Sequence, residues 1–103
     1  MALESRIFEL TQLDAKTLPE RALKLAEEAG EVAQAVLSAT GASGSAYKGL
    51  NLADVREEAA DTAIVALSIL AQTCEDEAMF KAELNRLLSE KCGKWEAVLK
   101  RQA

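Results

Sequence analysis

Hydrophobic positions repeat three and four residues apart along most of the chain, which is the spacing of one face of an α-helix. The first series predicts an amphipathic helix over residues 3–15. Its members are Leu3, Ile7, Leu10 and Leu13. Apart from Phe8, the positions between them are polar or charged, so this helix is expected to bury one face and expose the other.

The stretch TLPE, residues 17–20, predicts the start of a second helix. Thr17 has the place of an N-cap, and Glu20 lies three residues on, so the two residues form the pattern of a capping box. Pro19 is tolerated in the first turn because the amide hydrogen it lacks would have no helical partner there. The helix is expected to continue to about Ala39.

A glycine-rich segment, residues 40–51, predicts the longest loop of the chain. Asn51 is expected to cap a third helix, and Asp54 lies in its first turn, where the helix dipole favours an anion. This helix is expected to end near Cys74. Beyond Thr62 it is apolar nearly all round, so we expect it to be the buried central helix.

The acidic segment 75–77 is expected to open a fourth helix that ends near Lys100. The chain has a single proline and few clusters of β-branched residues, so nothing in it favours a sheet. Four helices joined by short connections and one longer loop predict an all-α fold, a four-helix bundle. A length of 103 residues suits one domain over residues 1–103.

Composition and charge narrow the classes of protein. Half of the residues are hydrophobic, but only one Trp, one Tyr and two Phe are present, so the core must be aliphatic. The net charge is −5 and no basic stripe is visible, so a nucleic-acid partner is not expected. The longest apolar run, residues 63–71, is too short to cross a bilayer, and the first ten residues lack the apolar segment of a signal peptide. The sequence therefore predicts a soluble, cytoplasmic protein without a membrane partner.

The two cysteines and the absence of histidine limit the chemistry further. Cys74 and Cys92 do not have the spacing of metal ligands, and without histidine a Cys/His zinc site and a histidine proton relay are excluded. We expect two reduced thiols. A disulfide between the last two helices is the alternative.

Acidic residues border the apolar faces of the second and third helices. Glu28 and Glu31 lie three residues apart on one strip, with Glu27 further round on the same flank. Glu58 and Asp61 repeat this spacing on the third helix. If the two helices pack as an antiparallel hairpin, the carboxylates are expected to converge.

Converging carboxylates repel one another, and partial burial strengthens the repulsion. Either some of them are protonated or a cation neutralises them. Ligands that offer only oxygen select a hard ion, Mg²⁺ or Mn²⁺, with Ca²⁺ as an alternative, and such a site suits metal-assisted hydrolysis of a phosphoanhydride. The simpler interpretation stays open: acidic residues near helix starts often complement the helix dipole in solvent.

The two acidic motifs resemble the E-E-x-x-E and E-x-x-D signature of the MazG-like, all-α nucleoside triphosphate pyrophosphohydrolases, a superfamily that includes dimeric dUTPases and dCTP pyrophosphatases. The stretches KLAEEAGEVAQAV and REEAADTAIVAL look like the helix sequences of this family, and the similarity covers roughly residues 20–100. The motif positions are Glu27, Glu28, Glu31, Glu58 and Asp61.

The resemblance implies a MazG-like bundle and a concrete reaction. Mg²⁺ ions would hold the triphosphate of a (deoxy)nucleoside triphosphate while a water molecule releases the monophosphate and pyrophosphate. Carried over by position, the metal ligands would be Glu28, Glu31, Glu58 and Asp61. Glu27 would orient or deprotonate the water.

The family also tends to carry basic residues late in the chain that reach the phosphates. Arg86, Lys91 and Lys94 are the candidates here, and Lys48 in the loop is another. The alternative is a C-terminal helix whose cations suit the helix dipole and the solvent.

The few aromatic residues limit the recognition of a base by stacking. Trp95 is one candidate, but its spacing from Leu88, Cys92 and Leu99 favours core packing. Phe8 resembles aromatic positions in the first helix that line the nucleotide pocket of some relatives, yet it lies among hydrophobic neighbours. The preferred base therefore stays open.

Three functions are compatible with the sequence. The first is a nucleotide pyrophosphohydrolase that sanitises the nucleotide pool. The others are a non-catalytic helical oligomerisation or adaptor domain and an enzyme similar to phosphoribosyl-ATP pyrophosphohydrolase. A chain this short with so apolar a third helix is expected to cover its hydrophobic surface as a homodimer or homotetramer.

Overall fold

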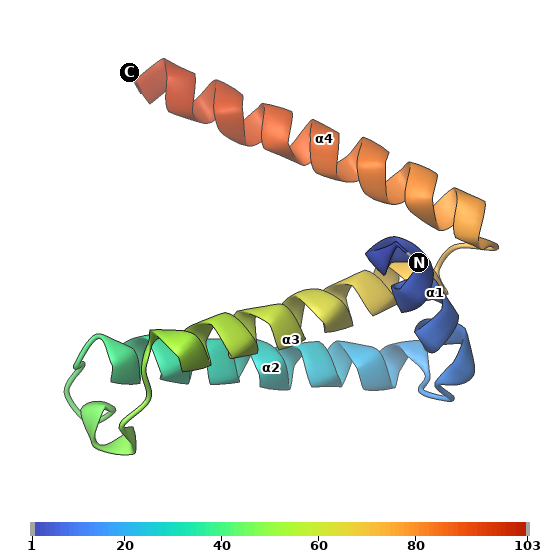
Figure 1. The fold of residues 1–103 in the computed structure, drawn as a ribbon. Coiled ribbons are helices and arrows are strands. Elements are labelled where there is room, and N and C mark those ends of the chain that lie inside the picture. Colours follow the sequence, from blue (N-terminus) through green and yellow to red (C-terminus); the bar gives the residue numbers. More distant parts are fainter. Residues whose placement is uncertain (1, 103) are drawn as a thin grey trace.

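A computed structural model describes residues 2–102, which form four α-helices and one short 3₁₀ turn and contain no strand (Figure 1). The elements are α1 (Leu3–Leu13), α2 (Leu18–Ala39), η1 (Ala46–Lys48), α3 (Leu52–Gln72) and α4 (Glu77–Gln102). The predicted all-α class is confirmed, and four helices are consistent with a bundle. The MazG-like type of bundle stays a prediction.

The helices that carry the acidic motifs both begin at a capping box. At α2, the Thr17 amide donates to Glu20 Oε1 at 2.8 Å and the Glu20 amide donates to Thr17 Oγ1 at 3.2 Å. At α3, Asn51 and Asp54 exchange the same two bonds, at 2.8 and 3.2 Å. The predicted starts of both helices are confirmed, and the register of each acidic motif is set by a local signal.

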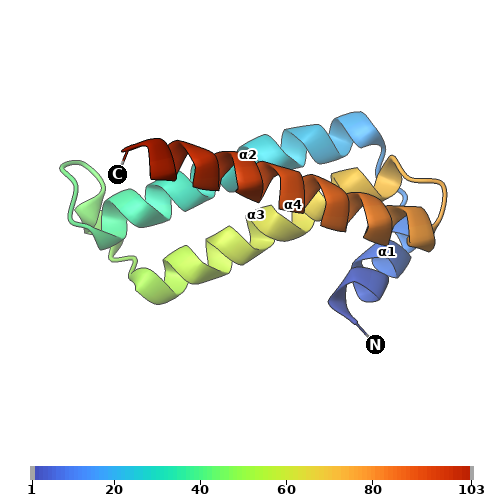
Figure 2. The same cartoon turned by 90° about the horizontal axis from the view of Figure 1, so that it is seen from above.

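α2 and α3 form an antiparallel hairpin and lie side by side over most of their length (Figures 1 and 2). The loop over residues 40–51 closes one end of the hairpin. Its last residues are held by the Leu50 amide, which donates to Ser38 Oγ at 3.0 Å, and by Lys48 Nζ, which donates to Gln34 Oε1 at 2.8 Å. The loop is thus attached to α2 rather than free.

The buried core lies at the opposite end of the hairpin, where α1 crosses α3 and α4 begins. Its members are Phe8, Ala71 and Phe80. The rings of Phe8 and Phe80 stack with their centroids 5.9 Å apart. This small cluster ties the first helix to the start of the last.

Arg21 is a buried cation that links three helices at the same end. It is 5% exposed. Its Nε donates to Gln72 Oε1 at 2.6 Å, and its Nη2 donates to the carbonyl oxygen of Thr11 at 3.2 Å. Because its polar hydrogens find acceptors on α1 and α3, the guanidinium fixes the base of the hairpin at little cost from burial.

Most of α4 extends away from the hairpin (Figure 1). It contacts α1 and α3 near its beginning, and within residues 2–102 it makes no contact with α2. Trp95 is 67% exposed, and its neighbours Leu88, Cys92 and Leu99 are exposed as well. The prediction that this face of α4 packs in a core is wrong for the single chain, because α4 diverges from the helices that were expected to cover it.

The prediction that α3 is buried is also wrong for the single chain. Ser68 and Ala71 are its buried residues, whereas Ile64 is 54% exposed. α3 contacts α1, α2 and α4. Because α4 diverges from α3 beyond the start of α4, one side of α3 is left uncovered (Figure 1). Cys74 and Cys92 are both free thiols. None of the described helices has an apolar stretch long enough to traverse a bilayer.

Candidate metal centre

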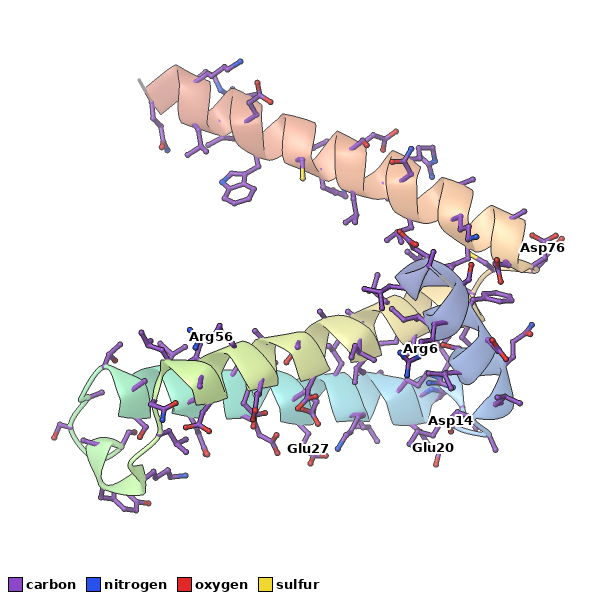
Figure 3. All side chains as sticks on the ribbon, in the orientation of Figure 1. Arg6, Asp14, Glu20, Glu27, Arg56 and Asp76 are labelled. Atoms are coloured by element: carbon purple, nitrogen blue, oxygen red, sulfur yellow. The ribbon has the colours of Figure 1, made fainter. Side chains whose placement is uncertain are left out.

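The acidic side chains of α2 and α3 come together in the middle of the hairpin (Figure 3, where Glu27 is labelled). Carboxylate oxygens within 4.8 Å of one another form two groups that share Glu28. One group is Glu27, Glu28 and Glu31, and the other is Glu28, Glu58 and Asp61. We call these five residues the acidic cluster. The convergence expected from their helical spacing is observed.

The acidic cluster runs from solvent into the interior of the hairpin. Glu27 and Asp61 are exposed, and Glu31 and Glu58 are half-buried. Glu28 is 6% exposed and is the most buried carboxylate of the cluster. A carboxylate in this position must be neutralised or fully hydrogen-bonded, because burial penalises the charged form.

Two oxygens of the acidic cluster lack a partner. Glu28 Oε2 and Glu58 Oε2 are buried, and within the described residues no donor reaches either atom. An unsatisfied buried acceptor carries a desolvation penalty of about 1–3 kcal/mol, and more when the group is charged. One carboxylate oxygen each from Glu28, Glu58 and Asp61 lie within 4.8 Å of one another, so the donor set fits a divalent metal.

The electrostatics of Glu58 agree with this conclusion. Its pKa is raised above the ordinary value, first because its carboxyl group shares a hydrogen-bonding contact with Glu31. Burial and the negative charges of Glu31, Asp61 and Glu28 raise the pKa further. The cluster therefore favours a proton, or a cation in its place, at Glu58.

Lys24 is the cation that pairs with the acidic cluster within residues 2–102. Its Nζ lies 3.1 Å from Glu28 Oε1 and 3.5 Å from Glu27 Oε1. These contacts raise the pKa of Lys24, the hydrogen bond to Glu28 most strongly, so the ammonium stays charged. One ammonium group beside five carboxyl groups leaves the cluster with excess negative charge.

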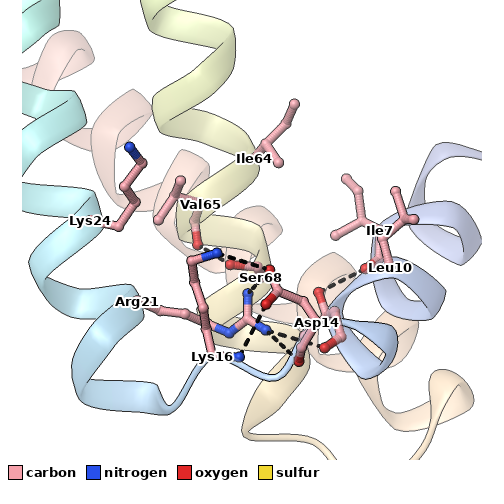
Figure 4. A pocket seen from close by; sticks show the side chains of 10 residues that line it. Ile7, Leu10, Asp14, Lys16, Arg21, Lys24, Ile64, Val65 and Ser68 are labelled. Atoms are coloured by element: carbon pink, nitrogen blue, oxygen red, sulfur yellow. Dashed lines mark hydrogen bonds and ion pairs between the residues drawn. The ribbon is translucent and has the colours of Figure 1, made fainter.

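A cavity of about 220 Å³ lies between α1, α2 and α3 (Figure 4), and none of the five acidic residues lines it. Lys24 lies on its wall and so borders both the cluster and the cavity. The apolar part of the wall is formed by Ile7, Leu10, Ile64 and Val65.

The predicted phosphate-binding residues lie outside the acidic cluster in the single chain. Lys48 is bound to Gln34 at the loop end of the hairpin. Arg86 pairs with Glu83 at 2.6 Å and with Glu90 at 3.2 Å on its own helix. Lys91 and Lys94 are exposed on the part of α4 that extends away from the hairpin.

The two aromatic candidates have opposite environments. Phe8 is 6% exposed and packs against Phe80, so it is part of the core. Trp95 stands in solvent on α4. Neither ring lines the cavity between α1, α2 and α3.

Sequence reasoning missed the pairing of Lys24 and the burial of Arg21. The signal for the first was present, because Lys24 precedes Glu28 by four residues, the spacing of a helical ion pair. Nothing local marks Arg21, whose acceptors Thr11 and Gln72 come from two other helices.

Comparison of the chain with protein-family models, with curated proteins and with solved structures found no match in any of the three. The geometry of the acidic cluster and the sequence motifs that form it are therefore the basis on which we infer a function. Both motifs lie on facing helices, and Glu28 connects the two groups of carboxylates.

Proposed function

We propose that this chain is a metal-dependent pyrophosphohydrolase of (deoxy)nucleoside triphosphates, similar to the MazG-like enzymes, with a role in sanitising the nucleotide pool. One observation carries the proposal: five carboxylates from two facing helices meet around Glu28, a buried residue with an oxygen that lacks a partner. Such an arrangement is unfavourable for a protein that does not bind a cation.

Mg²⁺ is the metal that best suits this donor set, and Mn²⁺ is a possible substitute. The cluster offers oxygen alone, which favours hard cations, and Mg²⁺ commonly joins one or two carboxylates to the phosphates of a substrate. The residues that would hold it are Glu28, Glu31, Glu58 and Asp61. When bound, the metal supplies charge neutralisation for the phosphate oxygens and activation of water.

The residues of the chain then have separate tasks in the reaction. The four ligands position the triphosphate beside α2 and α3. Glu27, at the exposed edge of the cluster, receives the proton of the attacking water, since no histidine is available as a base. The water oxygen bonds to the α-phosphorus, the bond from that phosphorus to the bridging oxygen breaks, and pyrophosphate leaves.

The proposed enzyme acts as a homodimer or homotetramer. Apolar side chains along α4 are exposed in the single chain, and a second copy would cover them. The principal ones are Leu88, Trp95, Val98 and Leu99. The same packing would allow α4 to bring Arg86, Lys91 and Lys94 toward the acidic cluster of another copy, where they would bind phosphate.

Substitution of one ligand on α3 tests the proposed function. With Mg²⁺ and a panel of nucleoside triphosphates, Glu58→Gln and Asp61→Asn should reduce pyrophosphate release by roughly 100-fold or more, as expected when a group that stabilises transition-state charge is lost. The helical circular-dichroism signal should be unchanged. Glu57→Gln, at the exposed neighbouring position, is the matched control and should retain activity.

The substrate panel also separates the competing functions. Release of pyrophosphate from phosphoribosyl-ATP, with none from the common nucleotides, would favour that related reaction. Normal hydrolysis by both variants would overturn the assignment of the site. No hydrolysis of any substrate and no binding of Mg²⁺ would support the helical adaptor instead.

A further inference from the structure

We propose that Lys24 is an exchangeable internal counter-ion of the acidic cluster: its ammonium group neutralises Glu28 in the metal-free protein and leaves when a divalent cation binds. Lys24 would thereby set the affinity of the site for metal. This inference rests on the proposed function, because it assumes that the cluster binds a divalent cation.

The position of the ammonium group makes it a direct competitor of the metal. Lys24 Nζ lies 3.1 Å from Oε1 of Glu28, the residue that belongs to both groups of converging carboxylates. It lies 3.5 Å from Glu27 as well. A divalent cation that draws on Glu28 must share this carboxylate with the ammonium or displace it, and two cations at this separation repel each other.

The ammonium group is an incomplete counter-ion. It reaches one oxygen of Glu28, while Glu28 Oε2 and Glu58 Oε2 remain buried without a partner. A divalent ion between α2 and α3 would carry twice the charge and could reach both helices. Replacement of the ammonium group by a divalent ion therefore stabilises the cluster as a whole. Lys24 reduces the free energy gained when the metal binds but does not prevent binding.

The side chain has a place to go when it leaves. It is 42% exposed and lies on the wall of the cavity of about 220 Å³ between α1, α2 and α3 (Figure 4). A lysine stem is flexible and its ammonium group is readily hydrated at such a surface. Displacement from Glu28 thus does not bury an unpaired charge.

A pair with the same spacing on α4 supplies the control. Lys81 Nζ lies 3.0 Å from Glu77 Oε2, also four residues away. Glu77 is 42% exposed, whereas the Glu28 side chain is 8% exposed, and Glu77 is in neither of the groups of converging carboxylates. The two lysines therefore share a four-residue spacing from their glutamates, in opposite order along the helix, but differ in the charge of their surroundings.

The experiment is a calorimetric titration of the nucleotide-free protein with Mg²⁺. Lys24→Met removes the charge and keeps an unbranched side chain, and we expect it to tighten Mg²⁺ binding roughly threefold to tenfold. Lys81→Met should leave Mg²⁺ affinity at the wild-type value. In the wild type, the NMR signals of the Lys24 ε-methylene should shift on addition of Mg²⁺, and those of Lys81 should not.

The possible outcomes separate this inference from the proposed function. Equal or weaker Mg²⁺ binding by Lys24→Met, beside normal binding by the wild type, overturns the role of Lys24 and leaves the metal site in place. An unchanged Lys24 signal at saturating Mg²⁺ overturns it as well. Failure of all three proteins to bind Mg²⁺ overturns the metal site itself, and the inference with it.

Discussion

The middle of the α2–α3 hairpin and the outer half of α4 are both incomplete in the single chain, but for opposite reasons. The hairpin has too much like charge around Glu28. The outer half of α4 has too much exposed apolar surface, with Trp95 as its largest side chain. An ion can complete the first region, whereas only another surface can complete the second. The contrast indicates that metal binding and association answer two separate needs of one short chain.

The largest expected effect is on the hairpin. Glu28→Gln keeps the shape of the buried side chain but removes the charge shared by both groups of carboxylates. We expect Mg²⁺ affinity, measured by calorimetry, to fall by roughly 100-fold, because a charged ligand close to a divalent ion is lost. Glu96→Gln, an exposed acid on α4, should have no effect. Equal losses of Mg²⁺ affinity from both changes would show that the affinity depends on the net charge of the protein and not on the acidic cluster.

The next effect concerns α4. Trp95→Ala removes the largest exposed aromatic side chain of this helix, and anchors of this type commonly account for about 2 kcal/mol or more of an interface. Sedimentation should show the oligomer dissociating at roughly 30-fold higher protein concentration than for the wild type. Glu96→Gln, at the adjacent exposed position, is the control. A wild-type chain that sediments as a monomer at micromolar concentration would contradict the proposed assembly.

A smaller effect should appear in the pH dependence of stability. Because the pKa of Glu58 is raised in the folded protein, its protonated form stabilises the fold. That contribution is complete below the pKa of the unfolded chain and is lost as pH rises through the folded pKa. In EDTA, the wild-type melting temperature should therefore fall relative to that of Glu58→Gln as pH increases above about 4.5, the ordinary pKa of a glutamate side chain.

Addition of Mg²⁺ should reverse this trend. The metal takes the place of the proton at the cluster, so the wild type should gain stability at neutral pH and Glu58→Gln should gain less. Parallel curves for the two proteins in EDTA would show that Glu58 is not under strain from its acidic neighbours.

The smallest effect compares the helix starts of the two regions. Asn51→Ala removes both side-chain acceptor bonds at the start of α3 and should lower the free energy of unfolding by about 1 kcal/mol. Asp76 accepts a bond of 2.8 Å from the Met79 amide at the start of α4. Asp76→Ala should leave Mg²⁺ affinity unchanged, because α4 has no residue in the acidic cluster. Urea unfolding measures the free energy of unfolding of Asn51→Ala, and calorimetry measures the Mg²⁺ affinity of Asp76→Ala.

The parts of the structure that were predictable from the sequence are those set by near neighbours. The starts of α2 and α3 depend on residues three positions apart, such as Thr17 with Glu20, and both were located correctly. The convergence of Glu28 with Glu58 and Asp61 needed one further assumption, an antiparallel hairpin. Two long helices that follow one another in the chain, joined only by the loop over residues 40–51, made that assumption reasonable.

The errors concern contacts between elements distant in sequence. The spacing of Leu88, Cys92, Trp95 and Leu99 shows that they share a face of α4, but a repeat does not say what that face touches. From this repeat we predicted that the face packs in a core, but in the single chain the face is exposed to solvent. The burial of Arg21 was missed for the same reason, since lone arginines are usually exposed and its acceptors lie on other helices.

The capping boxes have a consequence for changes in chain length. The position of each acidic motif around its helix is set by its distance from the N-cap of that helix. Residues added between Gly41 and Gly49 would therefore enlarge the loop and leave the carboxylates facing one another. One residue inserted between Asn51 and Glu58 would instead turn that carboxylate about 100° around the helix axis, away from its partners on α2. Insertions are thus tolerable in the connecting segment and disabling inside either helix, upstream of its acids.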